Sequence, residues 1–221
     1  AYLGANDFVK FDASAEKDGR VEFVGGAGND AFYGSAMGDF VDLTNVDGSN
    51  AINAGGNGND TIHTNGGNDQ IKIYGEYLTS ADTIDGGSGS DELIVSSTMT
   101  KKVMLGSQTI TNIEDISGNV YLTTNDATVA AGAKLTFDAQ GSRLIVDGSA
   151  ETNGHFVFNG GPGNDVLTGG ALSDLFNLIP GGNDTVNGGG GSDTFEFGDK
   201  NDSTPSSATL TAADKIDGGA G

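Results

Sequence analysis

The sequence predicts an all-β chain that folds as a right-handed parallel β-solenoid, a coil whose short strands stack into parallel walls. Three observations carry this prediction. A nine-residue pattern recurs along much of the chain, each copy is rich in glycine near its start, and a large apolar residue stands at the same place near its end. A repeat that is too short to bury its own apolar residue must stack on its neighbours, which favours a solenoid.

The repeated unit reads G-G-x-G-x-D-x-U-x, where U is a large apolar residue. Its glycine-rich front occurs in near-complete copies at residues 25–30, 55–60, 86–91, 160–165 and 188–193. Weaker copies, which have lost glycine but keep the spacing, begin at residues 34, 45, 64, 77, 169, 179 and 209. Residues 218–221 repeat the first four positions once more, so we expect the array to be truncated there in mid-repeat.

Two positions of the unit keep their chemistry along the whole chain. Position eight is always apolar: Phe32, Val41, Ile52, Ile62, Ile71, Ile84, Leu93, Leu167, Phe176, Val186, Phe195 and Ile216. Position six is acidic with one neutral exception: Asp30, Asp39, Asn50, Asp60, Asp69, Asp82, Asp91, Asp165, Asp174, Asp184, Asp193 and Asp214. A single Asp after Gly or Asn is ordinarily a solvated turn residue, but agreement in phase over so many units outweighs that interpretation.

Each unit accounts for one turn and one short strand. About six residues turn and three extend, and because side chains alternate along a strand, only the middle residue of the three points inward. Two successive units then make one coil, and the apolar residues of its two walls meet in a core of one layer. Burying one such side chain contributes roughly 1.5–3 kcal/mol, whereas ordering each backbone residue costs on the order of 1–2 kcal/mol. Hydrophobic burial alone therefore does not hold the coil together.

The composition narrows the classes of function. The chain has 31 acidic and 10 basic residues, and its formal net charge of −21 argues against nucleic-acid binding, which needs clustered positive charge. Cysteine is absent, so no disulfide can stabilise the coil. A glycine-rich acidic chain can also be disordered, but here the 35% of hydrophobic residues recur at fixed places, which favours an ordered fold that binds cations.

These units resemble the nonapeptide repeats of the RTX (repeats-in-toxin) family, which fold as a parallel β-roll that binds calcium in its turns. The likeness covers residues 25–93 and 160–196 well. It implies calcium ligation by the position-six residues given above, and by turns that contain Gly26, Gly28, Gly56, Gly58, Gly87, Gly89, Gly161, Gly163, Gly189 and Gly191. It also implies that each ion lies between the turn of one unit and the turn two units later, which gives about seven calcium ions.

The chemistry of the unit agrees with calcium. Calcium takes six to eight oxygen ligands and tolerates irregular geometry. We expect glycine at positions one, two and four to let the turn enter left-handed or otherwise forbidden backbone conformations, so that carbonyl oxygens converge on one point. One edge would stack Asp30, Asn50, Asp69 and Asp91, the other Asp39, Asp60 and Asp82, and the second array would pair Asp165 with Asp184 and Asp174 with Asp193. Asn50 supplies only a neutral oxygen, and the glycine-free turns before Asp82 and Asp214 predict weak or absent ions there, with these two residues as caps.

The middle of the chain lacks the repeat, so we divide it into three parts. Residues 1–93 form a first array with a degenerate start at 1–24, residues 94–159 an ion-poor spacer, and residues 160–221 a second array. Short alternating runs in the spacer predict strands, and apolar runs lead directly into the glycine motifs. We expect larger, ion-free β-helical coils that continue the solenoid; a separate small β-sandwich is the alternative. The spacer also resembles those of bacterial surface-layer and giant RTX adhesin proteins.

Catalytic motifs are missing from the sequence, so we expect no enzyme in this chain. His63 and His155, the only histidines, fit structural or solvent-facing roles. The resemblance implies a structural module of a type I secreted protein at the surface of a Gram-negative bacterium, folding on calcium after export, within a surface-layer or adhesin-type protein. The alternative is an accessory module of a secreted enzyme or toxin. Expected partners are calcium ions, with self-assembly or contact with cell-surface polysaccharide, and neither nucleic acid nor a membrane interior.

Overall fold

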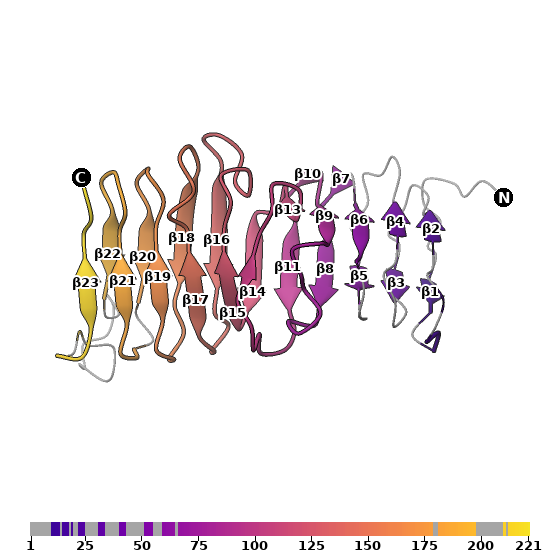
Figure 1. The fold of residues 1–221 in the computed structure, drawn as a ribbon, viewed down its shortest axis with the longest axis horizontal. Helices are drawn as coiled ribbons and strands as arrows, with labels where there is room; N and C mark the ends of the chain where they lie inside the picture. Colours follow the sequence, from indigo (N-terminus) through magenta and orange to yellow (C-terminus); the bar gives the residue numbers. More distant parts are fainter. Residues whose placement is uncertain are drawn as a thin grey trace.

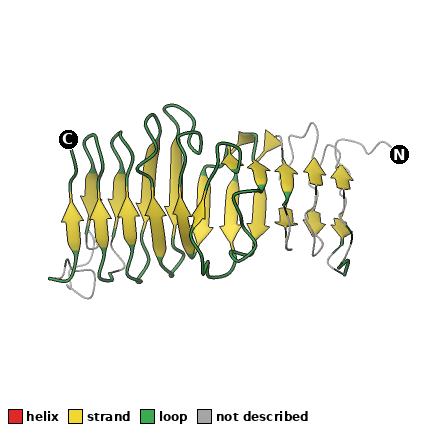
Figure 2. Ribbon diagram, viewed as in Figure 1, coloured by secondary structure: helices red, strands yellow, loops and turns green. Residues whose placement is uncertain are grey.

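The chain forms an elongated solenoid of short parallel strands with β1 near one end and β23 at the other (Figure 1). The computed structural model describes residues 10–13, 15–17, 19, 22–24, 31–33, 40–42, 51–54, 59–64, 66–178, 181–197, 210 and 212–221. Within these residues every regular element is a strand (Figure 2). No helix long and apolar enough to cross a membrane occurs among them.

One wall of the solenoid is a single ten-stranded parallel sheet, which we call the long wall. Its strands, in spatial order, are β1 (Lys10–Asp12), β3 (Ala31–Tyr33), β5 (Ala51–Ala54), β8 (Gln70–Ile73), β11 (Glu92–Val95), β14 (Asp115–Gly118), β16 (Lys134–Asp138), β18 (His155–Asn159), β20 (Leu175–Asn177) and β22 (Thr194–Glu196). Spatial order equals sequence order, as stacking of successive coils requires. The predicted all-β parallel β-roll is confirmed.

The opposite wall is divided into two parallel sheets. The first contains β2 (Glu22–Val24), β4 (Phe40–Asp42), β6 (Thr61–His63), β9 (Thr83–Asp85) and β13 (Ile110–Thr111). The second contains β12 (Val103–Met104), β15 (Val120–Thr123), β17 (Leu144–Asp147), β19 (Val166–Thr168), β21 (Thr185–Asn187) and β23 (Lys215–Asp217). Two short turn segments, β7 (Gly66–Gly67) and β10 (Ser88–Gly89), pair with each other. The wall changes sheet at the coil between β11 and β14, where the nine-residue repeat has ended.

The core lies between the walls and is built from position eight of the repeat. The buried residues of this set are Phe32, Ile52, Ile62, Ile71, Ile84, Leu93, Leu167, Phe176 and Val186, and Phe195 and Ile216 pack against them partly buried. The side chain of Val41 lies outside the described residues. The register places position eight of each unit beside position eight of the next coil, as for Ile71 and Leu93. The alternation inferred from the sequence thus holds through both arrays.

The middle segment continues the same solenoid with longer strands. β14, β16 and β18 lie within the long wall, so these residues do not form a separate sandwich. β16 buries both Leu135 and Phe137, and β18 buries both Phe156 and Phe158. The core is two side chains wide in β16 and β18, which agrees with the larger coils that we expected here. In the first array, however, β8 also buries Ile73 and β11 also buries Val95, so the prediction of a single layer is wrong in those two strands. Longer strands bury enough apolar surface to stack without a glycine-rich turn at each corner.

Candidate metal sites in the turns

The position-six aspartates form two ladders, one along each edge of the solenoid. We call the edge with the turns that lead from the divided wall to the long wall the upper edge, and the other the lower edge, as in Figure 1. On the upper edge the backbone N–H of Asp69 donates to Asp91 Oδ1 at 2.8 Å, and that of Asp174 to Asp193 Oδ1 at 2.9 Å. The carboxylate of one aspartate therefore accepts a hydrogen bond from the backbone of the aspartate in the preceding coil.

The lower edge repeats this contact. Asp60 N–H donates to Asp82 Oδ1 at 2.9 Å, Asp165 N–H to Asp184 Oδ1 at 2.9 Å, and Asp184 N–H to Asp214 Oδ1 at 2.7 Å. The structure thus brings together the predicted neighbours Asp60 and Asp82, and Asp165 and Asp184, and it adds the contact of Asp184 with Asp214. The remaining predicted ligands, Asp30, Asp39, Asn50, Gly26, Gly28, Gly56 and Gly58, lie outside the described residues.

One carboxylate oxygen in several rungs has no partner within the protein. Asp91 is 1% exposed and Asp165 is 0% exposed. In Asp91, Asp165 and Asp193 the second oxygen, Oδ2, is buried and accepts no hydrogen bond. Burying an unpaired carboxylate oxygen is costly, and a bound cation removes that cost. These oxygen atoms meet the requirement of calcium for hard, negatively charged ligands.

Glycine at position one leaves room for this oxygen. A Cβ atom added to Gly160 would lie 2.5 Å from Asp165 Oδ2, one added to Gly169 would lie 2.3 Å from Asp174 Oδ2, and one added to Gly188 would lie 2.2 Å from Asp193 Oδ2. No side chain fits at such distances. None of these three glycines has a positive φ, so the left-handed conformation that we considered for position one does not occur there. The space beside the carboxylate accounts for glycine at these three positions.

Glycines at positions two and four follow the predicted conformation in only some units. Gly87, Gly89, Gly189 and Gly191 have φ values of 83°, 148°, 91° and 90°. Gly161 and Gly163 do not have positive φ, so the left-handed conformation does not occur there. A Cβ atom on Gly161 would lie 2.2 Å from the carbonyl oxygen of Ser142 in the preceding coil, so glycine is required at this position for space.

The electrostatics of the ladder also favour a bound cation. Burial raises the pKa of Asp165 to about 7, and the nearby carboxylate of Asp184 adds to the effect. Burial likewise raises the pKa of Asp174 to about 6, with a further contribution from Asp193. Stacked carboxylates that are withdrawn from water resist ionisation when nothing positive lies between them.

The candidate ligand set mixes side-chain and backbone oxygens. In the part of the chain that the structure describes, no three His, Cys, Asp or Glu side chains are grouped so as to hold a metal by themselves. A site in these turns must therefore combine aspartate with backbone carbonyls, as calcium loops do. His63 Nδ1 lies 3.7 Å from Asp85 Oδ2, and His155 Nδ1 lies 2.7 Å from the carbonyl oxygen of Ser173. Neither histidine belongs to a rung of the ladder.

The rung at Asp82 differs from those at Asp91, Asp165 and Asp193. Its Oδ1 atom accepts from Asp60 N–H of the preceding coil, and its Oδ2 atom accepts from Thr79 N–H of the glycine-free turn at 2.7 Å. Both oxygens are thus engaged by backbone donors, as are those of Asp174, which accept from Phe156 N–H and Gly170 N–H. This arrangement is compatible with the predicted cap, and the absence of a strong ion there stays a prediction.

The repeat pattern did not predict two glutamates of the spacer, Glu114 and Glu151. Glu114 Oε2 accepts from Asp91 N–H at 2.8 Å and so extends the upper ladder by one rung. Glu151 is 0% exposed, its Oε1 accepts from Gly154 N–H at 2.8 Å, and its Oε2 is buried without a partner. The available signal was the coil spacing: Glu114 follows Asp91 by 23 residues, and Asp91 follows Asp69 by 22.

Comparison with known proteins supports the assignment of the turns. A family model of the RTX calcium-binding nonapeptide repeat, which spans four copies, matches residues 18–41, 54–72, 79–95, 157–176 and 181–203. The matched segments contain all rungs of the ladders described above except Glu114 and Asp214. Searches among curated proteins and among solved structures gave no match.

Proposed function

Because this chain carries RTX calcium-binding nonapeptide repeats, we propose that it is a non-catalytic module that folds on calcium outside the cell and gives a secreted surface protein its rigid shape. Calcium binding and a structural role follow from the repeats themselves. The observation that carries the proposal further is the buried, unpartnered Oδ2 atom of Asp91, Asp165 and Asp193. Folding without a cation would leave these oxygens uncompensated.

The charge of the chain links folding to the compartment. At a formal net charge of −21, a calcium-free chain repels itself and resists compaction. Calcium binding neutralises the turns and contributes its binding free energy to folding. A low calcium concentration in the cytosol would keep the chain unfolded for type I secretion, and the higher concentration outside would fold it. RTX repeat proteins are generally secreted, which supports an extracellular location.

A surface-layer or adhesin-type parent is the role we favour. The long wall runs through both arrays and the middle segment, so the module is one continuous solenoid and not two domains on a flexible linker. Such continuity suits a protein that must set a fixed distance at a cell surface. The second candidate is an accessory module of a secreted enzyme or toxin, favoured by the wide use of these repeats beside catalytic domains.

Circular dichroism with and without calcium tests the proposed folding. We expect mostly coil in chelator, and recovery of the β signal at millimolar calcium but not at the same concentration of magnesium, which demands more regular geometry. Equal β content in chelator and in calcium would overturn the proposal. Electron microscopy of the secreted parent protein tests the biological role: calcium-dependent lattices or fibres support a surface protein, and hydrolytic activity in the parent supports the accessory module.

A further inference from the structure

The upper ladder does not stop where the repeat stops. Asp69 N–H donates to Asp91 Oδ1 at 2.8 Å, and Asp91 N–H donates to Glu114 Oε2 at 2.8 Å. Glu114 lies between β13 and β14, in a short turn without the glycine motif. Its longer side chain places a carboxylate where the next position-six aspartate would stand.

The oxygen arrangement of a repeat turn is also present at this junction. In the second array, a Cβ atom on Gly188 would meet Asp193 Oδ2 at 2.2 Å and the carbonyl oxygen of Gly218, in the following coil, at 2.6 Å. At Gly86, a Cβ atom would meet Asp91 Oδ2 at 2.8 Å and the carbonyl oxygen of Asn112, again in the following coil, at 2.2 Å. Two oxygens from successive coils thus converge beside the position-one glycine in both places.

Asn112 takes the place of a glycine in this contact. It adopts a left-handed conformation with a φ of 51°, which Asn tolerates better than most residues. Its side-chain Nδ2 donates to Asp85 Oδ1 at 2.8 Å, which holds the turn beside Gly86. The turn after β13 therefore presents a carbonyl oxygen and a carboxylate to the last repeat of the first array.

Charge at the junction is unbalanced. Asp91 is 1% exposed, and its Oδ2 atom accepts no hydrogen bond. The charged groups that act on it are the carboxylates of Asp69, Glu114 and Asp85, and all three repel its negative charge. A column of carboxylates at coil spacing is stable only with a cation beside it.

The lower edge ends differently and serves as an internal comparison. In the coil after Asp82, Thr109 Oγ1 donates to the carbonyl oxygen of Ser80 at 3.1 Å and accepts from Gly106 N–H at 2.9 Å. The backbone N–H of Asp82 donates to the carbonyl oxygen of Thr79 within its own turn at 3.5 Å. Among the described residues, no carboxylate of the following coil accepts from Asp82, whereas Glu114 accepts from Asp91 on the upper edge.

We propose that Glu114 is a calcium ligand, and that an ion bound at Asp91, Glu114 and the Asn112 carbonyl oxygen closes the first array from within the spacer. The inference rests on the proposed calcium binding of the repeats and adds a site outside them. It replaces our expectation of an ion-free spacer at this one coil.

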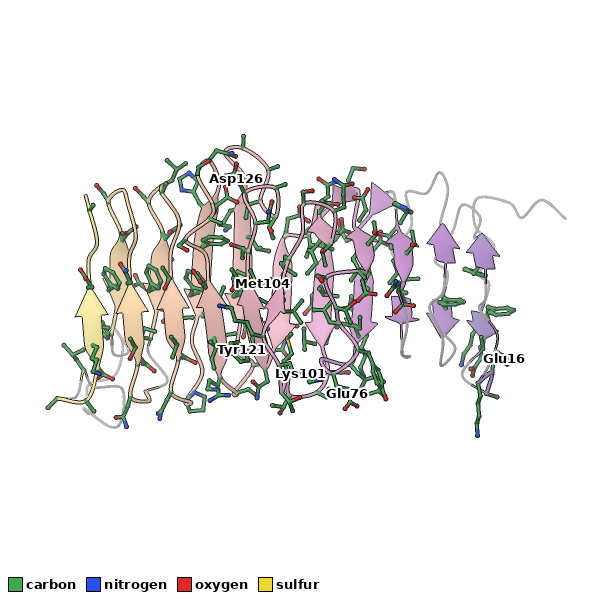
Figure 3. The ribbon with its side chains drawn as sticks, viewed as in Figure 1. Glu16, Glu76, Lys101, Met104, Tyr121 and Asp126 are labelled. Carbon is green, nitrogen blue, oxygen red and sulfur yellow. The ribbon has the colours of Figure 1, made fainter. Side chains whose placement is uncertain are left out.

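The test compares the full chain with its Glu114→Gln variant by isothermal titration calorimetry and equilibrium dialysis with calcium. Gln keeps the acceptor for Asp91 N–H but removes the charge. We expect one ion fewer per chain, or one site weakened by about tenfold or more. The matched control is Glu76→Gln, because Glu76 is exposed on the lower edge (Figure 3) and should leave the ion count unchanged.

Each outcome decides the matter. An unchanged number of ions with unchanged affinities in Glu114→Gln overturns this site while leaving calcium binding by the repeats intact. Wild-type protein that binds no calcium overturns the proposed function itself, and this site with it. If Glu114→Gln does not fold in calcium, Glu114→Asp is measured. Retention of the charge should restore folding and the full ion count, and a failure of Glu114→Asp to do so overturns the assignment.

Discussion

The backbone N–H of Asp165 donates a hydrogen bond to Asp184 Oδ1 at 2.9 Å, across the interval between two successive coils. The same carboxylate column that ties the coils together also concentrates negative charge in a buried place. Hydrogen bonds between backbone and aspartate hold the turns in register, and the unpaired Asp165 Oδ2 leaves the register dependent on a cation.

The calcium-free protein should gain stability on acidification. Asp165 has a folded-state pKa of about 7, raised by burial from an ordinary value of 3.8. A raised folded-state pKa means that a proton binds more tightly to the folded chain than to the unfolded chain. The stabilisation of the folded state by this proton is fully present below about pH 4 and is lost as the pH rises through 7. Because we expect the calcium-depleted protein to be mostly coil near neutral pH, its β signal in circular dichroism should therefore rise between pH 7.5 and pH 5. A β signal that falls over this range would contradict the prediction.

Asp165→Asn should have opposite effects with and without calcium. In chelator the variant is expected to show more β signal in circular dichroism than wild type, because a buried charge is gone. In saturating calcium it should be less stable, and a tenfold loss of affinity at one site corresponds to about 1.4 kcal/mol. Circular dichroism in chelator and thermal melts in calcium measure the two effects. Asp126→Asn is the control, because Asp126 is an exposed turn residue of the spacer (Figure 3) and should show no change of sign.

Gly188→Ala should weaken the second array. The new methyl group would lie 2.2 Å from Asp193 Oδ2, so either the carboxylate or the turn must move. We expect a loss of about 1–3 kcal/mol in calcium, together with weaker calcium binding. Gly218→Ala is a matched control, since Gly218 also stands at position one and has no atom within 4 Å of an added Cβ. Equal losses in both variants would show that backbone freedom, and not space, governs position one.

Phe176→Ala should destabilise the core between the spacer and the second array. Phe176 is 0% exposed, and its ring stacks on Phe158 at 4.9 Å and on Phe195 at 5.0 Å. Truncation of a buried Phe typically costs about 3–5 kcal/mol. Melting in saturating calcium measures the loss, with Phe197→Ala as the exposed comparison at 36% exposure. A loss confined to less than about 1 kcal/mol would mean that calcium in the turns, and not this ring stack, carries the stability of these coils.

The repeat phase alone was sufficient to predict the walls, the inward apolar column and the pairs of aspartates. These follow from a nine-residue spacing in which one residue of three can point inward, as Ile71 and Leu93 do. The nine-residue spacing is lost where turn lengths vary, so the repeat pattern did not predict Glu114. Its side chain is one carbon longer than that of Asp and its turn is shorter, so it meets the ladder from a different place in the sequence.

The role of individual glycines was harder to predict than their positions. Position one of the repeat is glycine because Asp174 Oδ2 occupies the space beside Gly169. Sequence cannot distinguish such a steric requirement from a need for positive φ, since both exclude every other residue. The second buried residue of β8 and of β11, Ile73 and Val95, was not predicted, because each lies one position beyond its nine-residue unit.

The direction of the long wall determines how the solenoid responds to force. Its strands run across the long axis, so the hydrogen bonds between coils point along that axis (Figure 1). Tension applied between the ends therefore loads one pair of coils after another and peels them away singly, without shearing many strands at once. Resistance to pulling is then set by the weakest interval between coils, and lengthening the array with further repeats extends its reach without raising its breaking force.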